Sequence, residues 1–252
     1  MCLINFQFHN HPAYKLVVAA NRDEFYGRPT AAAHFWEDAP HILAGRDLKE
    51  KGTWMGITKA GRFAALTNFR DPERETDGKR TRGEIVRNFL DSDMPADAFM
   101  RSLDPDAYNG FNLIAGTPDA LFYFNNIEGG VQEISPGIHG ISNRFLDTPW
   151  PKVVKGKAGL AEALKGGTVD PEELFALMQR AEPAADAALP DTGVGRDLER
   201  RLSPLFIKME EYGTRSSTVL TVNKTGDAEF IERTYDAGVF MDEKRFSFRL
   251  PS

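Results

Sequence analysis

The sequence has almost no cysteine: Cys2 is the only one among its 252 residues. One cysteine cannot close a disulfide within the chain, and this composition is typical of a reducing compartment, so we expect a cytoplasmic location. No run of apolar residues approaches the roughly 18 that a membrane-spanning helix needs. The first residues also lack the basic start and apolar stretch of a signal peptide. We therefore expect no integral membrane segment.

The sequence has fewer positive than negative charges. It contains 31 Lys and Arg residues and 37 Asp and Glu residues, which gives a net charge of −6. This balance argues against nucleic acid as a partner. The sequence has neither a phosphate-binding loop nor a dinucleotide fingerprint. The pair His9 and His11 lies on a predicted turn without a cysteine or carboxylate partner. We therefore expect no cofactor and no metal site.

One cluster of basic residues is more typical of a solvated loop than of a phosphate-binding site. Its members are Lys79, Arg80, Arg82 and Arg87.

Length and composition are those of a globular protein. Apolar residues make up 41% of the chain and charged residues 27%, and the chain is long enough to bury a sizeable core. No internal repeat, low-complexity segment or linker divides the sequence. We expect one domain over residues 1–252.

Alternation of apolar and polar residues predicts most of the strands. They are expected at Cys2–Phe8, Lys15–Ala20, Trp54–Thr58, Arg62–Thr67, Asn112–Gly116, Leu121–Asn125, Val131–Ile134, Gly137–Ser142, Thr218–Asn223 and Glu229–Tyr235. Helices are expected at Gly83–Leu90, Ala96–Leu103, Trp150–Leu164 and Pro171–Arg180, the last with Asp170 as its N-cap. The segment Glu24–Thr53 is expected to be irregular. Strands early, in the middle and late, with helices in two clusters, favour antiparallel sheets covered by helices over a regular βαβ array.

Cys2 follows Met1 directly, and this position has chemical consequences. If Met1 is removed, Cys2 carries a thiol and a free α-amine whose pKa is about 7.7–8.0. An amine with that pKa is a suitable general base for the thiol at neutral pH. With Met1 retained, the same nitrogen is an amide and this chemistry is lost. The alternative interpretation is that Cys2 is only a small buried side chain of the core.

The residues expected beside Cys2 follow from strand pairing. If the first two strands form a hairpin, the numbers of paired residues sum to about 23 or 24, so Cys2 lies opposite Asn21 or Arg22. Arg22 could then hold a thiolate or a substrate carbonyl by charge-assisted hydrogen bonds. Asp23 could orient the α-amine as a carboxylate orients a catalytic base. The alternative is a strand end whose polar residues only face water.

Three further polar residues lie at or beside strand ends. Asn68 and Asn143 each follow a short apolar strand, where a side-chain amide is a good donor to an oxyanion. Arg215 precedes a late strand and could supply a second cationic donor. The alternative for the two asparagines is that each only starts a turn.

A series of short motifs extends along nearly the whole chain. In order they are Met1-Cys2, Ala20-Asn21-Arg22-Asp23-Glu24-Phe25, Arg28-Pro29-Thr30, Ala44-Gly45-Arg46-Asp47, Gly52-Thr53-Trp54, Leu66-Thr67-Asn68, Arg82-Gly83-Glu84, Tyr108-Asn109-Gly110-Phe111-Asn112-Leu113, Ser142-Asn143, Pro149-Trp150-Pro151-Lys152, Leu189-Pro190-Asp191-Thr192-Gly193 and Tyr212-Gly213-Thr214-Arg215-Ser216-Ser217-Thr218. Taken together, they resemble the NRDE-motif family, which includes the transport-and-Golgi-organisation protein 2 homologues. Lys51 and Thr81 depart from the pattern, since the family often has glycine and serine there.

This resemblance implies an α+β fold, a four-layer αββα sandwich of mostly antiparallel sheets of the N-terminal-nucleophile hydrolase kind. It is similar to the branch that includes penicillin V acylase, bile-salt hydrolase and acid ceramidase. In that branch the site consists of an N-terminal cysteine, an arginine and an aspartate on the next strand, asparagine oxyanion donors and a later arginine. Carried over, this set is Cys2, Arg22, Asp23, Asn68, Asn143 and Arg215. Whether Asp23 or Glu24 positions the α-amine stays open.

Two functions remain open on this basis. The first is hydrolysis of a C–N amide bond, or a thioester, through an acyl-Cys2 intermediate. The second is a non-catalytic carrier that keeps the pocket and binds haem or an acyl-coenzyme A or other lipid, because the family is associated with lipid metabolism and haem handling. In both cases the expected partner is a small molecule: an acyl amide, an acyl thioester or haem.

Overall fold

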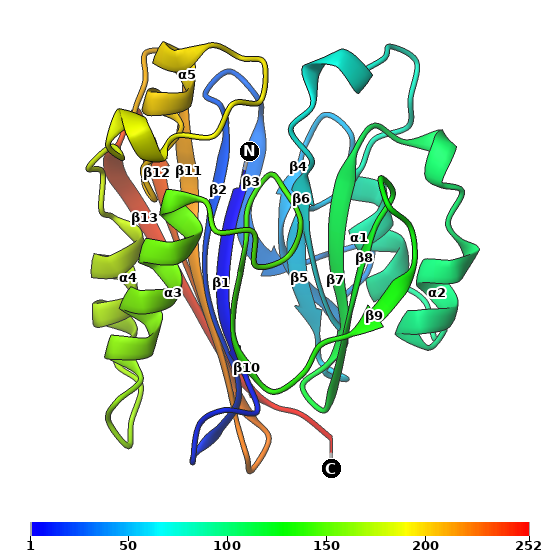
Figure 1. Cartoon of the computed structure of the whole chain (residues 1–252). Coiled ribbons are helices and arrows are strands. Elements are labelled where there is room, and N and C mark those ends of the chain that lie inside the picture. Colours follow the sequence, from blue (N-terminus) through cyan, green and yellow to red (C-terminus); the bar gives the residue numbers. More distant parts are fainter. Residues whose placement is uncertain (1, 252) are drawn as a thin grey trace.

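The computed structural model describes residues 2–251, in which two β-sheets lie face to face with helices on both outer sides (Figure 1). Helices α3 (Pro151–Ala163) and α4 (Pro171–Met178) cover one sheet. Helices α1 (Gly83–Leu90) and α2 (Ala96–Ser102) cover the other. This is the α+β, αββα sandwich that the sequence predicts, and the fold class is therefore confirmed.

Both sheets are antiparallel throughout the pairs that the structure describes. The first has the order β10-β1-β2-β11-β12-β13, with β1 (Cys2–Phe8), β2 (Tyr14–Phe25), β10 (Gly137–Ile141), β11 (Tyr212–Asn223), β12 (Asp227–Asp236) and β13 (Val239–Arg249). The second has the order β3-β4-β5-β6-β7-β8-β9, with β3 (Thr30–Phe35), β4 (Ile42–Asp47), β5 (Met55–Thr58), β6 (Phe63–Asn68), β7 (Phe111–Thr117), β8 (Ala120–Asn125) and β9 (Val131–Glu133).

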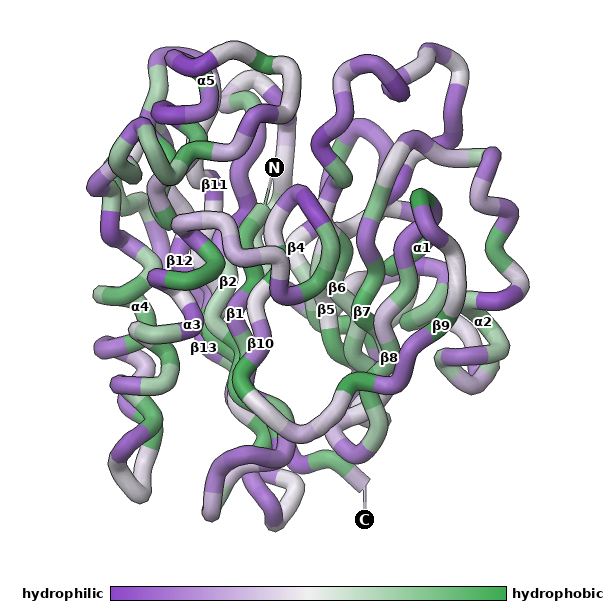
Figure 2. The backbone as a smooth tube through the Cα atoms, in the orientation of Figure 1, coloured by the Kyte–Doolittle hydropathy of each residue, from purple (hydrophilic) through white to green (hydrophobic). Residues whose placement is uncertain are grey.

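Strand β1 shows how alternation builds two cores from one segment. Ile4 and Phe6 point into the core between the sheets, whereas Leu3 points into the core beneath α3 and α4. Because both faces of the strand are covered, every residue of β1 is buried. Figure 2 shows the same distribution, with hydrophobic residues along the strands and hydrophilic ones in the loops at both ends.

Several predicted helix boundaries agree closely with the structure. Helix α1 has the predicted bounds, and α4 begins with Pro171 after the N-cap Asp170, whose side chain accepts a hydrogen bond from the Glu172 N–H. A short helix, α5 (Arg196–Arg201), was not predicted. Among residues 2–251, no helix is both long enough and apolar enough to cross a membrane.

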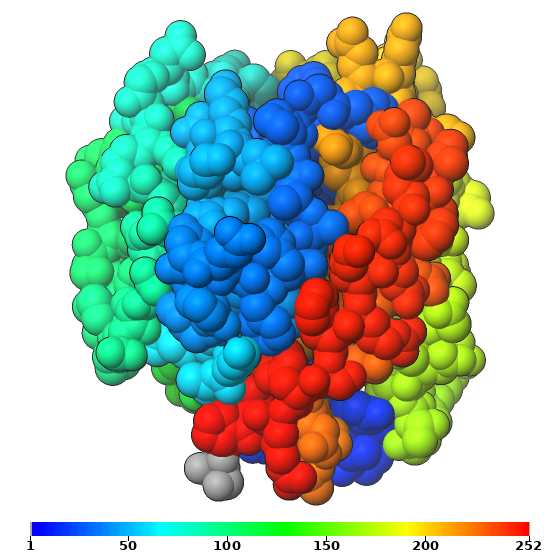
Figure 3. All heavy atoms as spheres, turned by 180° about the vertical axis from the view of Figure 1, so that it is seen from behind, coloured from blue at the N-terminus to red at the C-terminus, as the bar shows by residue number. Residues whose placement is uncertain are grey.

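The prediction of an irregular segment at Glu24–Thr53 was wrong, because β3 and β4 lie within it. These strands are short, and β3 is rich in alanine, which gives a weak strand signal. Strand β13 was also missed, because it is an edge strand whose residues are mostly exposed. Seen from behind, this C-terminal strand lies against the segment that contains β3 (Figure 3), where Phe35 contacts Phe246 and Phe248.

Candidate active site

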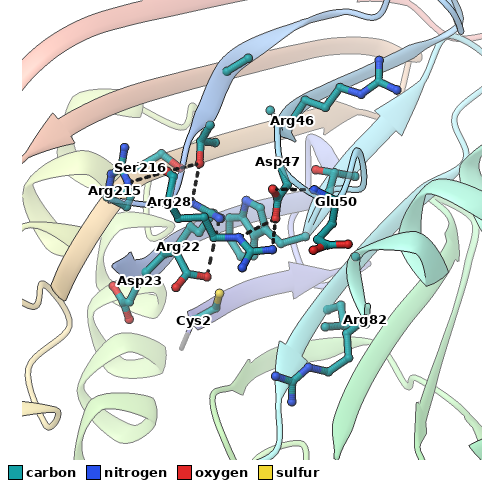
Figure 4. Close-up of a pocket in the computed structure, with 18 of the residues that line it drawn as sticks. Cys2, Arg22, Asp23, Arg28, Arg46, Asp47, Glu50, Arg82, Arg215 and Ser216 are labelled. Carbon is teal, nitrogen blue, oxygen red and sulfur yellow. Dashed lines mark hydrogen bonds and ion pairs between the residues drawn. The ribbon is translucent and has the colours of Figure 1, made fainter. Parts of the chain in front are cut away.

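A pocket of about 540 Å³ opens between the two sheets at the end where β1 begins. Its wall combines residues of both sheets with the segments around residues 28, 50 and 80 (Figure 4). Charged side chains outnumber aliphatic ones among the lining residues. Among residues 2–251, no group of His, Cys, Asp and Glu side chains is arranged to hold a metal ion.

Cys2 lies on this wall directly opposite Arg22 in the β1–β2 pairing, one of the two partners that the hairpin argument allows. Figure 4 shows the Cys2 sulfur facing into the pocket. Burial raises the pKa of the Cys2 thiol, while the Arg22 guanidinium and a hydrogen bond from the Asp23 backbone act in the opposite direction. The Ser142 hydroxyl donates to the Cys2 carbonyl at 2.9 Å and fixes the start of the strand.

Asp23 follows Arg22 in β2. Because side chains alternate along a strand, the Asp23 side chain points away from the pocket face, to the helix-covered face of the sheet. There Thr214 Oγ1 donates to Asp23 Oδ1 at 2.7 Å, and Tyr212 Oη donates to the Asp23 carbonyl at 3.0 Å. Burial raises the pKa of the Asp23 carboxyl, and the nearby cations Lys152 and Arg22 act to lower it. Asp23 therefore lies beside the beginning of β1, on the side away from the Cys2 thiol.

Glu24 returns to the pocket face, where its Oε2 lies 3.8 Å from Arg22 Nη2. Arg22 Nη1 also donates to Thr30 Oγ1 at 3.4 Å, which is a long hydrogen bond. Arg22 is thus held loosely beside the thiol.

Arg215 lies at an irregularity in the β2–β11 pairing, between Thr214 and Ser216. Such a bulge redirects a side chain out of the regular alternation. The Arg215 guanidinium donates to three backbone carbonyls at the end of β2 and in the turn after it, at 2.9–3.1 Å: those of Phe25, Tyr26 and Arg28. It lines the pocket and also fixes the segment that carries Arg28.

The two candidate oxyanion donors occupy different positions. Asn68, at the end of β6, lines the pocket, and its side-chain amide makes no hydrogen bond to the part of the chain that the structure describes. Asn143 is fully buried and is not part of the pocket wall. Its Nδ2 donates to the Asn68 carbonyl at 2.9 Å, so it supports Asn68 from behind.

Two buried residues beside this site were not predicted. Lys152, in the first turn of α3, is only 2% exposed, and its ammonium makes no hydrogen bond within residues 2–251. Burial, with repulsion from Arg70, lowers the pKa of Lys152 to about 8, although Asp23 and Cys2 attract its charge. A lysine next to proline at a helix start is ordinary on a surface, so the sequence carried no signal of burial.

The other residue is Glu232 on β12, whose carboxylate accepts a hydrogen bond from the Ala33 N–H of β3 at 2.6 Å. It therefore joins the two sheets at the pocket wall. Burial raises the pKa of Glu232 to about 7. The sequence held a weak signal here, because alternation places Glu232 on the same face as the core residue Phe230.

Arg82 also lines the pocket, although its cluster was interpreted as a solvated loop. Its Nη1 donates to the Gly110 carbonyl at 3.0 Å. Two of the sequence motifs position it, because the Thr53 N–H donates to the Gly83 carbonyl at 3.1 Å. Gly52 packs so closely on Gly83 that a Cβ at Gly52 would lie 2.5 Å from the Gly83 carbonyl carbon.

Residues 1–237 match the family model described as Transport and Golgi organisation 2. Among relatives, the chain is 39% identical over 257 residues to the Transport and Golgi organization protein 2 homolog of Bos taurus, covering 93% of each chain. It is 36% identical to the human homolog over 257 residues, again covering 93% of each, and 29% identical to the Drosophila melanogaster protein over 265 residues, covering 93% of this chain and 92% of that one.

Two solved structures have a similar fold at low sequence identity. One is the mutant C2A conjugated bile acid hydrolase from Clostridium perfringens, with a TM-score of 0.55, 9% identity and coverage of 99% of this chain and 92% of that one. The other is an N-acylethanolamine-hydrolyzing acid amidase ortholog from Caenorhabditis elegans, with a TM-score of 0.53, 11% identity and coverage of 86% and 92%. At these identities the likeness shows that the fold is shared and says nothing about the substrate.

Proposed function

This chain belongs to the Transport and Golgi organisation 2 family, and we propose that it is an N-terminal-cysteine hydrolase that cleaves a C–N amide bond, or a thioester. The observation that carries this proposal is the direct pairing of Cys2 with Arg22 on the wall of a polar pocket. Support also comes from the fold, which is shared with two proteins whose names describe hydrolases of an N-acylethanolamine and of conjugated bile acids.

The proposed nucleophile requires removal of Met1, which lies outside the described residues 2–251. The free α-amine of Cys2 takes the thiol proton, and the thiolate attacks the substrate carbonyl carbon. When the tetrahedral intermediate collapses, the α-amine returns this proton to the leaving nitrogen, and an acyl-Cys2 thioester remains. Water then attacks the thioester and gives its proton to the α-amine, and Cys2 leaves with that proton, which releases the carboxylic acid.

The surrounding residues have separate roles in this proposal. The free amide of Asn68 donates to the oxyanion, and Asn143 holds the Asn68 backbone in place. Arg22 stabilises the negative charge that develops beside the thiol. Asp23 is the better candidate than Glu24 for orienting the α-amine, because its carboxyl lies on the other face from the thiol, at the start of β1. Arg215 fixes the turn that carries the pocket residue Arg28.

The test uses protein whose N-terminus has been established by intact-mass measurement. Wild-type protein lacking Met1 is incubated with panels of acyl amides and acyl thioesters, beside Cys2→Ala and a form in which an N-terminal extension keeps the Cys2 nitrogen as an amide. We expect hydrolysis by the processed wild type only. Hydrolysis that persists in Cys2→Ala would contradict the nucleophile. Ligand binding that is unchanged in Cys2→Ala, with no turnover of any panel member by wild type, would favour the carrier of haem or acyl-coenzyme A instead.

A further inference from the structure

Seven cationic side chains line the pocket: Arg22, Arg28, Arg46, Lys79, Arg80, Arg82 and Arg215. Three of them form close ion pairs with carboxylates of the chain, and Lys79 and Arg215 contact backbone carbonyls. Close ion pairs join Arg28 to Asp47, Arg46 to Asp38 and Arg80 to Glu84, each at 2.5 Å. Lys79 Nζ donates to the Asp106 carbonyl at 2.5 Å, and Arg215 is held by three carbonyls.

Arg22 and Arg82 differ from the three arginines that form close ion pairs. Their nearest carboxylates within residues 2–251 lie 3.8 Å away, at Glu24, and 3.6 Å away, at Glu75. Charge-assisted hydrogen bonds between guanidinium and carboxylate are about 2.7–2.9 Å long, so neither arginine has a close anionic partner in the described chain. Within residues 2–251, the Arg82 guanidinium uses only the donors of Nη1 among its five N–H donors, for the Gly110 carbonyl and the distant Glu75.

The position of Arg82 relates it to the reacting groups. The Gly110 carbonyl that it contacts also accepts a hydrogen bond from the Phe69 N–H at 2.9 Å, one residue after Asn68. Figure 4 shows Arg22 and Arg82 on opposite sides of Cys2. Burial lowers the pKa of Arg82, and the negative charges of Glu75, Glu24 and Cys2 act against this. A partly desolvated cation with unused donors is therefore held beside the proposed oxyanion donor.

We propose that Arg82 binds an anionic group of the substrate, a carboxylate or a phosphate, so that the enzyme favours small acyl amides or thioesters that carry such a group over neutral ones. This inference rests on the proposed hydrolase and specifies its substrate class. Arg82 is a specificity residue in this scheme, since Arg22 serves the reacting carbonyl. The charged lining of the pocket suits a polar substrate of this kind better than a long hydrocarbon chain.

The experiment compares substrates that differ only in charge. An N-acyl amino acid is paired with its primary carboxamide, and an N-acyl phosphoethanolamine with the N-acyl ethanolamine of the same acyl chain. For wild type we expect kcat/KM to favour the anionic member of at least one pair by about 10- to 100-fold, the range of one charge-assisted interaction. Arg82→Gln should remove this preference, mainly through KM, and Arg82→Lys should keep part of it. Equal reactivity of both members in wild type, or a preference that survives in Arg82→Gln, would overturn the proposal.

Arg80→Gln is the matched control, because it removes the same charge from the same loop but from a guanidinium that Glu84 already neutralises. We expect its preference to change by less than about threefold, and a loss as large as that of Arg82→Gln would assign the effect to the net charge of the pocket and refute a specific role for Arg82. Thermal unfolding of each variant verifies folding, and Arg82→Lys carries the test if Arg82→Gln does not fold.

Calorimetric binding to Cys2→Ala separates this proposal from the hydrolase itself. The same substrate pairs are titrated into Cys2→Ala with and without Arg82→Gln, at low and high salt. Tighter, salt-sensitive binding of the anionic member that disappears with Arg82→Gln supports the anion site, even if wild type hydrolyses nothing. Equal binding of both members by Cys2→Ala refutes the anion site, even if wild type is an active hydrolase.

Discussion

Lys152 holds a positive charge where the fold does little to stabilise it. Its ammonium is buried in the first turn of α3, where the helix dipole also opposes a cation. Arg70 repels this charge, whereas Asp23, Cys2 and Glu199 attract it. A buried lysine of this kind costs stability, and its position beside Cys2 makes it a candidate for a role in the proposed reaction.

We predict that Lys152→Met stabilises the protein and impairs the reaction. The pKa of Lys152 is about 8 in the folded state and about 10.5 in a free lysine. Below pH 8 both states are protonated and the folded state carries the whole cost, so the substitution should raise the free energy of unfolding by roughly 1–3 kcal/mol at pH 7. The gain should shrink as the pH rises from about 8 to 10, because the folded wild type then loses its proton while the unfolded chain keeps it.

Urea unfolding at pH 7 and pH 10, with hydrolysis of a panel substrate, measures both effects. Lys155→Met on the exposed side of the same helix is the control, and it should change stability by less than about 0.5 kcal/mol. Full activity in Lys152→Met would show that the buried charge has no part in the reaction.

At the scale of the elements, alternation of apolar and polar residues predicted the strands that bring Cys2 near Arg22. It did not predict where those strands end, because their ends are polar. Two apolar segments joined by a short turn place Cys2 opposite Asn21 or Arg22, and the structure has the second of these registers. The sequence did not show that β2 continues through Asp23 and Glu24, or that β11 begins at Tyr212. These ends pair with each other and face a pocket, so their polar residues hide the strand pattern.

The position of Arg82 in the pocket could not be predicted for a related reason. Its place in the pocket depends on a contact between two loops, at Gly52 and Gly83, that are distant in sequence and carry no periodic signal. The motif Arg82-Gly83-Glu84 indicated the family but not which residue faces the ligand. Asn143 illustrates the converse, since its motif was recognised but its amide supports the backbone of Asn68 and does not reach the pocket wall.

We predict that Gly52→Ala disturbs the site through this loop contact. The new Cβ would lie 2.5 Å from the Gly83 carbonyl carbon and 2.9 Å from the Glu84 nitrogen, which are backbone atoms and can only move together with Arg82. We expect a loss of roughly 1–3 kcal/mol in the free energy of unfolding and a fall in kcat/KM for anionic substrates. Gly27→Ala is the control, because its Cβ would meet nothing within 4 Å. Equal stability of the two variants would show that the loops separate without cost.

At the scale of the whole molecule, the pocket exists only while the two sheets keep their separation. Glu232 joins the sheets on one side of the pocket through the Ala33 N–H. On the other side, Arg70 extends from the end of β6 and forms an ion pair with Glu199 of α5 at 2.7 Å, both side chains being buried. Arg70 also stacks over Trp150, the N-cap of α3. The two halves of the sandwich are therefore connected by buried charges beside the pocket.

We predict that Glu199→Ala weakens the whole sandwich, because it leaves the buried Arg70 guanidinium without this carboxylate and also removes the acceptor of the Thr192 N–H and hydroxyl. Removing one partner of a buried ion pair costs about 3–5 kcal/mol, so the midpoint of urea unfolding should fall markedly. Asp197→Ala, in the same helix, removes a carboxylate that pairs with Arg200 at the surface, and should cost less than about 1 kcal/mol. If both variants unfold at the same urea concentration, the buried pair does not hold the halves together, and the pocket depends on the contacts between the sheets alone.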